Sequence, residues 1–172
     1  MEPQEKKEVL DALLDRAIEG KKVLCAENNG CADAPPLLIG ELGNGDVFLC
    51  PDLNDGHPTD TLPLMLEVVA HKMNEHTNSF RYKWLAYVVE GFATPPSALS
   101  PEQLAGEWKR GAMEEDFHNN PSSQVREGII ITLYPFDGKP IGATVFYTYD
   151  DHGQPVFGSP ELVSNEDGEM GG

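Results

Sequence analysis

Residues 125–157 read VREGIIITLYPFDGKPIGATVFYTYDDHGQPVF, and the fold of the chain follows from this stretch. It contains two long runs of β-branched and aromatic residues and a short third run, separated by Asp137-Gly138 and by His152-Gly153. Asp-Gly between such runs is among the stronger short-range signals for a β-hairpin. The C-terminal half is therefore predicted to be an antiparallel meander.

A further strand is predicted upstream of the meander. Residues 80–92, FRYKWLAYVVEGF, are rich in the aromatic and β-branched residues that are enriched in strands. We predict that Phe80–Phe92, Val125–Phe136 and Ile141–Tyr149 pair as antiparallel strands of one sheet.

The N-terminal part predicts a helix followed by a second hairpin. Residues 3–19 carry apolar side chains in one stripe of helical period, and Gly20 is a natural stop. The apolar runs Leu37–Leu42 and Asp46–Cys50 flank Gly43-Asn44-Gly45. Glycine and asparagine tolerate positive φ angles, so a tight turn between two strands is expected there.

The remaining elements are shorter or less regular. Lys22–Ala26 could form a short strand, and Asn28-Asn29-Gly30 is typical of a turn. Residues 61–76 predict a second helix with one apolar face. Ser100-Pro101-Glu102 has the form of a helix start, with serine as the cap and proline in the first turn. Phe117–Ser123 is expected to be a loop.

Together these segments predict an α+β fold. The expected architecture is a single domain over residues 1–158, with an antiparallel sheet of about five or six strands and two or three helices packed on one face. Residues 159–172 are polar, acidic and rich in glycine, and we expect a disordered acidic tail.

The charge of the chain restricts its partners. The 172 residues carry 29 acidic and 12 basic side chains, which gives a formal net charge of −17. The excess is spread along the chain, and no segment has the Lys/Arg cluster needed to neutralise phosphates. We therefore expect no binding to nucleic acid or to an anionic membrane. The charged N-terminal segment MEPQEKKEVL has no apolar stretch typical of a signal peptide, so we expect a cytoplasmic protein.

The cysteines suggest a zinc site only weakly. Cys25, Cys31 and Cys50 could join His57 in a Cys3His set, but five residues separate the first two cysteines, where zinc knuckles usually have two to four. An odd number of cysteines also argues against a disulfide framework. We predict free thiols and no stoichiometric metal.

One aspartate-rich loop offers a candidate site for a metal cation. Asp52, Asp55, His57 and Asp60 lie in one loop, where carboxylates could hold a hard cation, although turn formation and helix capping also explain them.

His71 and His76 are five residues apart, so a helix would turn them away from each other. Asp150-Asp151-His152 lies in a predicted hairpin turn, and turn formation alone accounts for it. The sequence has no nucleophile elbow, zinc-protease motif or phosphate loop. We accordingly predict no catalytic, cofactor-binding or metal-ligating residues and no cofactor.

The C-terminal part resembles a group of small proteins. Arg126-Glu127-Gly128, Phe136-Asp137-Gly138 and Tyr149-Asp150-Asp151-His152-Gly153 carry the resemblance, which covers residues 85–160. They are similar to motifs of small uncharacterised proteins found in actinobacteria and their bacteriophages. The resemblance implies a cytosolic setting, which is the host cytoplasm if the chain is phage-encoded. It implies no activity.

The leading functional hypothesis is a non-enzymatic acidic domain that binds another protein. Its charge favours a basic partner, and a phage-encoded accessory or anti-host-defence role would fit. Two alternatives remain: a small metal-dependent enzyme using the Asp52–Asp60 loop, and an acidic mimic of a nucleic acid. Trp108 and Phe117 are the candidate exposed anchors of a protein-binding surface, although core packing is the expected role of each.

Overall fold

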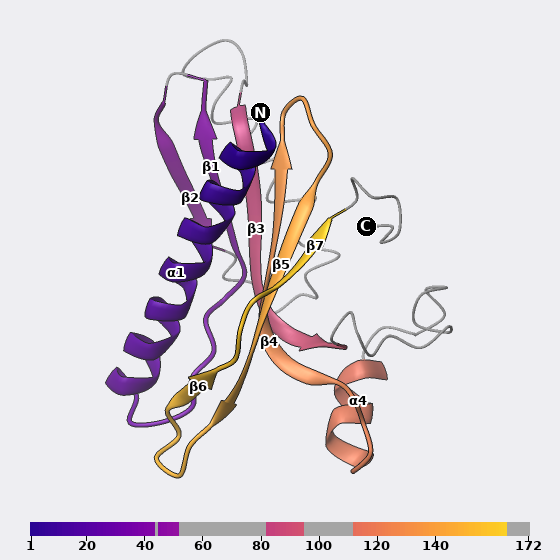
Figure 1. Ribbon diagram of the computed structural model, residues 1–172. Helices are drawn as coiled ribbons and strands as arrows, with labels where there is room; N and C mark the ends of the chain where they lie inside the picture. Colours follow the sequence, from indigo (N-terminus) through magenta and orange to yellow (C-terminus); the bar gives the residue numbers. More distant parts are fainter. Residues whose placement is uncertain (44, 52–81, 95–111, 165–172) are drawn as a thin grey trace.

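The computed structural model describes residues 1–43, 45–51, 82–94 and 112–164, and shows one sheet with a long helix against it (Figure 1). The elements, in chain order, are α1 (Pro3–Glu27), β1 (Leu37–Leu42), β2 (Val47–Pro51), β3 (Tyr82–Ala93), α4 (Ala112–Asn119), β4 (Arg126–Pro135), β5 (Ile141–Tyr149), β6 (Pro155–Phe157) and β7 (Glu161–Ser164).

The sheet confirms the predicted antiparallel pairing. Its strand order is β2-β1-β3-β4-β5-β6, and β7 also pairs with β5. The register places Val88 of β3 opposite Ile131 of β4, and Ile131 opposite Ala143 of β5. The three strands predicted over residues 80–92, 125–136 and 141–149 are therefore neighbours, with Asp137-Gly138 in the turn between β4 and β5.

The two other predicted hairpins are also present. In the first, β1 pairs antiparallel with β2, and the Leu42 N–H donates to the Asp46 carbonyl (2.8 Å). In the second, β5 pairs with β6, and Asp150 Oδ1 accepts hydrogen bonds from the backbone N–H groups of His152 (2.8 Å) and Gln154 (2.9 Å). Asp150 therefore serves the turn, as its sequence context predicted.

Helix α1 is longer than the sequence indicated. It continues through Gly20 and includes Lys22–Ala26, so the predicted stop and the short strand are wrong. The helix continues because its buried stripe continues: Lys21 and Cys25 are buried at the same period as Leu14 further up the helix. The packing of these residues on the sheet outweighs the weak helix propensity of one glycine. The predicted turn at 28–30 is confirmed, and Asn29 there has a φ of 56°.

Two other expectations differ from the structure. Glu161–Ser164 forms strand β7 and pairs with β5, so this part of the segment 159–172 is ordered. Phe117 lies in helix α4 rather than in a loop. The helix predicted at 61–76 and the helix start at Ser100-Pro101-Glu102 lie outside the described residues.

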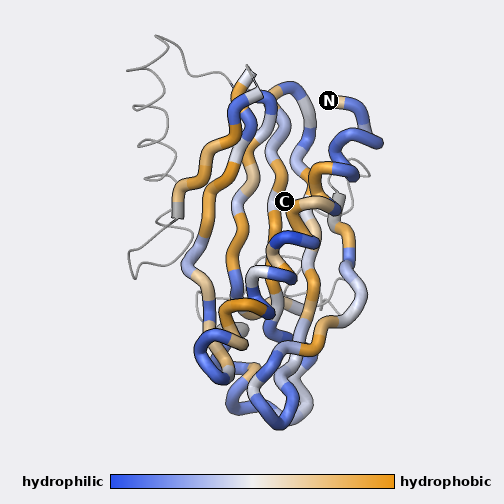
Figure 2. Tube along the Cα trace, turned by 90° about the vertical axis from the view of Figure 1, so that its left-hand side faces the viewer, coloured by the Kyte–Doolittle hydropathy of each residue, from blue (hydrophilic) through white to orange (hydrophobic). Residues whose placement is uncertain are grey.

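The main core lies between α1 and one face of the sheet. Figure 2 shows hydrophobic residues concentrated along the strands and hydrophilic residues in the turns at the lower end of the view. The buried cluster consists of Leu10, Leu13, Leu14, Ile39, Trp84, Ala86, Ile129, Ile131, Leu133, Ala143, Val145 and Tyr147. Leu38, Leu85 and Tyr87 alternate with these residues along β1 and β3 and form a second buried cluster on the opposite face.

Two glycines predict opposite effects of an added methyl group. A Cβ at Gly20 would meet no atom within 4 Å, whereas a Cβ at Gly40 would lie 2.7 Å from the Phe48 ring. We expect Gly20→Ala to raise the free energy of unfolding by about 1 kcal/mol, because alanine is the better helix former. Gly40→Ala should lower it, because β1 and the ring must move apart.

Urea unfolding of the two variants and the parent protein measures both effects. A destabilising Gly20→Ala substitution would show that Gly20 has a structural role in the free protein.

Candidate functional site

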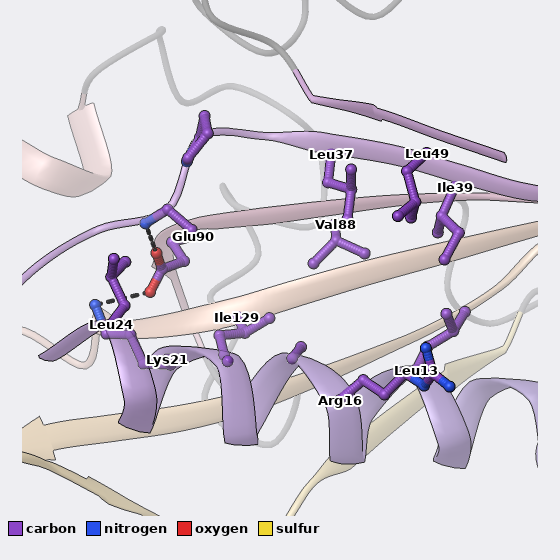
Figure 3. Close-up of a pocket in the computed structure, with 14 residues that line it drawn as sticks. Leu13, Arg16, Lys21, Leu24, Leu37, Ile39, Leu49, Val88, Glu90 and Ile129 are labelled. Atoms are coloured by element: carbon purple, nitrogen blue, oxygen red, sulfur yellow. Dashed lines mark hydrogen bonds and ion pairs between the residues drawn. The ribbon is translucent and has the colours of Figure 1, made fainter. Parts of the chain in front are cut away.

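An apolar groove lies beside α1, because this helix covers only part of its face of the sheet. Helix α1 packs on β4, β5 and β6, while β2, β1 and β3 continue the same face beyond it. The space between them is a cavity of about 420 Å³, called here the α1 groove (Figure 3). Its lining consists of Leu13, Arg16, Ala17, Gly20, Lys21, Leu24, Ala34, Pro35, Leu37, Ile39, Leu49, Val88, Glu90 and Ile129.

The wall of the groove is one flank of α1. Leu13, Ala17, Gly20 and Leu24 contribute to it at spacings of four, three and four residues, which place them on one side of a helix. Ala17 and Gly20 have small side chains or none, so the middle of this wall projects less into the groove than its two ends.

The floor of the groove is the sheet. Leu37 and Ile39 alternate along β1 and therefore point to the same face, where Leu49 of β2 and Val88 of β3 join them (Figure 3). Ile39 is buried, but the neighbouring β2 residues are open: Leu49 is 64% exposed and Val47 is 61% exposed. The apolar floor thus continues outward to the edge strand of the sheet.

One end of the groove is closed by a buried ion pair. Lys21 Nζ lies 2.8 Å from Glu90 Oε1 and 2.9 Å from Asp33 Oδ1, and its side chain is 1% exposed. Lys21 Nζ also donates to the Ala32 carbonyl and lies over the Tyr147 ring, 4.8 Å from its centroid. Glu90 in turn accepts hydrogen bonds from the Ala34 N–H and from the Tyr147 hydroxyl (3.3 Å).

The electrostatics of this end favour a fixed charge on Lys21. Burial by itself lowers the pKa of Lys21, but hydrogen bonds to Glu90, Tyr149 and Asp33 outweigh burial and hold the pKa above its usual value. Burial and the Glu90 carboxylate raise the pKa of Tyr147, so its hydroxyl stays neutral and can donate. A nucleophilic lysine needs a lowered pKa. Lys21 is therefore a protonated partner that holds the groove together, and it is not an activated nucleophile.

Charged side chains border the apolar part of the groove. Arg16 extends along α1 toward Leu13, at the end away from the ion pair, and has no ion-pair partner in the part of the chain that the structure describes (Figure 3). A shallower hollow continues over the outer flank of α1, where Glu19 and Glu27 accompany Val23 and Leu24. With the exposed Asp33 near Lys21, the rim has more acidic than basic groups.

The three cysteines, which were weighed as zinc ligands, differ in burial and form no disulfide. Cys25 is buried and its Sγ lies 3.7 Å from the Ala32 carbonyl oxygen, Cys31 is exposed and Cys50 is half-buried. All three are free thiols. Over residues 1–43, 45–51, 82–94 and 112–164, no group of three or more His, Cys, Asp or Glu side chains is placed to hold a metal ion.

Other sequence candidates are either outside the described residues or serve the fold. Asp52, Asp55, His57, Asp60, His71, His76 and Trp108 lie outside them. Phe117 is half-buried, with its ring centroid 5.1 Å from that of Phe92 and 5.2 Å from that of His118. Phe117 therefore follows the core-packing alternative and is not an exposed anchor, because α4 turns its ring against β3.

Sequence reasoning missed the α1 groove. A signal for it was present in Leu13, Ala17, Gly20 and Leu24, which lie along one flank of the helix and begin at the buried residue Leu13. Treating Gly20 as a helix stop removed half of that flank from consideration.

Three comparisons with known proteins found no similar protein: no family model, curated protein or solved structure matches this chain. Within the described residues, no helix has the length and apolar character needed to span a bilayer.

The Lys21–Glu90 pair predicts a strong effect of removing one charge. Lys21→Met leaves the Glu90 carboxylate buried without its cation, and we expect a loss of about 3–5 kcal/mol in the free energy of unfolding. Asp33→Asn removes the other carboxylate partner of Lys21, but Asp33 is 71% exposed, so we expect less than about 1 kcal/mol. Denaturant titrations of both variants provide the test, and equal effects would contradict it.

Proposed function

We propose that this protein is a non-enzymatic binding domain whose α1 groove receives apolar side chains of a partner protein. The observation that carries the proposal is an apolar channel that stays open beside α1 and extends onto exposed Val47 and Leu49. Exposed apolar surface of this kind, rimmed by charged groups, is typical of a protein-interaction site. A volume of about 420 Å³ accommodates several side chains.

The chemistry of the groove supports binding rather than catalysis. Ten of its fourteen lining residues are apolar, Gly20 has no side chain, and the buried pair Lys21–Glu90 is already satisfied by its neighbours. Arg16 remains as a charged group that can orient a ligand. A hydrolytic or transfer reaction would need a nucleophile and a base within reach of one another, and the lining supplies no such pair.

The charge of the chain supports a basic partner. Each encounter takes place in the field of a net charge of −17, and Glu19, Glu27 and Asp33 add acidic groups near the groove. Such a field steers a positively charged partner and repels a negatively charged one. The apolar contacts supply the affinity, because surface charges mainly affect the rate of association.

A peptide selection tests the proposed site. We expect a random peptide library to yield binders that combine Lys or Arg with large apolar residues. These binders should lose affinity for Leu49→Lys, which places a charge on the floor of the groove. Leu162→Lys is the matched control, because Leu162 is 55% exposed on β7, near the opposite edge of the sheet, and the charge change is the same. Equal binding by the two variants, or no enrichment, would refute the groove as the site.

The salt dependence of binding tests the electrostatic part. For a selected basic peptide, the association rate should fall several-fold between low and high salt, because the Debye length shrinks from roughly 30 Å at 0.01 M to 3 Å at 1 M. The dissociation rate should change less, because apolar contacts hold the complex. Surface plasmon resonance at several salt concentrations measures both rates, and a salt-independent association rate would contradict charge steering.

A further inference from the structure

We propose that the partner segment in the α1 groove is a basic amphipathic α-helix that lies alongside α1 and completes a second helix position on the sheet. This inference rests on the proposed function and adds the conformation and orientation of the bound segment. It follows from the width of the groove, the shape of its wall, and the distribution of charge around it.

The width of the uncovered face suits one helix. Among the described strands, β2, β1 and β3 lie side by side on the flank of the sheet away from β5, and on their α1-facing side Ile39 is buried whereas Leu37 and Val88 are half-buried and Leu49 is exposed. At about 4.8 Å between neighbouring strands, their axes span about 10 Å. Packed helices lie about 8–10 Å apart, and β1 is two strand spacings, about 10 Å, from β4, so a helix over β1 would approach packing distance from the part of α1 that lies over β4.

The wall of the groove suits the close approach of another helix. From Leu13 to Leu24 it extends about 16 Å at 1.5 Å per residue, which is about three helical turns. Ala17 and Gly20 lie in the middle of it, and a Cβ on Gly20 would meet no atom within 4 Å. A glycine inside a helix costs about 1 kcal/mol relative to alanine. In the free fold no neighbouring atom at Gly20 requires the absence of a side chain. A second helix crossing at Gly20 would occupy the space that a side chain would otherwise fill.

The charges around the wall select the polar face of the bound helix. Glu19 and Glu27 lie on the outer flank of α1, next to Gly20 and Leu24, while Arg16 lies at the Leu13 end of the wall. Lysine or arginine side chains at the margin of the docked helix can reach these carboxylates while its apolar face covers Leu37, Leu49 and Val88. A second copy of this chain is disfavoured as the occupant, because each copy carries a net charge of −17.

The main competing arrangement is a strand added to the edge of the sheet. Among the described strands β2 lies at an edge of the sheet, and its sequence VFLCP has no charged side chain to discourage pairing. Because the Leu42 N–H bonds to Asp46, the alternation of an antiparallel ladder directs the N–H groups of Val47 and Leu49 away from β1. Strand addition would protect these two amides from hydrogen exchange, and a docked helix would leave them without a new partner.

Three synthetic peptides of about four helical turns distinguish the arrangements. The first has Leu and Lys in helical period, the second has the same residues in strict alternation, and the third replaces Lys of the first with Glu. We expect the full chain to bind the first peptide at least about tenfold more tightly than either of the others. The bound peptide should gain helical circular dichroism.

The matched variants are Gly20→Leu and Ala26→Leu. Gly20→Leu fills the middle of the wall, and because its Cβ has free space the fold should remain intact; we expect affinity for the helical peptide to fall by about tenfold or more. Ala26 is exposed on α1 but does not line the groove, so Ala26→Leu should bind like the parent protein. Denaturant unfolding of both variants confirms that each is folded.

The outcomes separate this inference from the proposed function. Tighter binding of the alternating peptide, with slowed exchange of the Val47 and Leu49 amides, would overturn the helix and leave the binding function standing. Binding of the helical peptide that is lost in Leu49→Lys but unchanged in Gly20→Leu would also overturn placement beside α1. Absence of binding by all three peptides, or binding unaffected by either variant, would overturn both proposals.

Discussion

Among the described residues, helix α1, about 10 Å across, faces a sheet whose six side-by-side strands span about 24 Å. Helix α1 packs mainly on β4, β5 and β6. The buried residues Ile129, Ile131 and Val145 belong to this covered part. What remains on the same face is the β2–β1–β3 side, and its apolar residues become progressively more exposed from Ile39 to Leu49. Within the described part of the chain, the groove thus lies where one helix meets a wider sheet.

The ion pair of Lys21 and Glu90, together with the buried leucines of α1, holds the helix on the sheet and closes one end of the groove. Lys21 is directed inward from the helix, Glu90 is near the end of β3, and both are bonded to the segment at 32–34 that follows α1. The Gln154 side chain donates to the Cys25 carbonyl (3.3 Å) and ties the turn between β5 and β6 to the same helix end. With Lys21 fixed inward, the preceding residue, Gly20, lies about 100° around the helix on the groove side. A polar interaction at one end therefore positions an apolar wall along the whole helix.

Local patterns predicted the sheet well and the groove poorly. Asp137-Gly138, His152-Gly153 and the glycines at 43 and 45 encode turns within a few residues, and each joins strands that pair across it. Local patterns could not predict the length of α1, because a lysine at position 21 suggests an exposed residue. Its burial depends on Glu90, which is distant in the sequence. The groove depends on where α1 lies across the sheet, which involves contacts between residues far apart in the chain. For the same reason the sequence alone could not decide between an exposed and a packed Phe117, which is half-buried against Phe92.

Gly20 connects the stability of the fold with the shape of the groove. The packing of Leu14, Lys21 and Cys25 keeps the helix intact across this residue, so the glycine is tolerated without being required there. Alanine would make the free helix more stable, and any larger side chain would occupy the space over β1. A binding surface commonly retains such residues, which lower the stability of the free protein and are compensated only in the complex. In this chain the compensation would come from a second helix beside α1, which would also bury the apolar floor left open by the first.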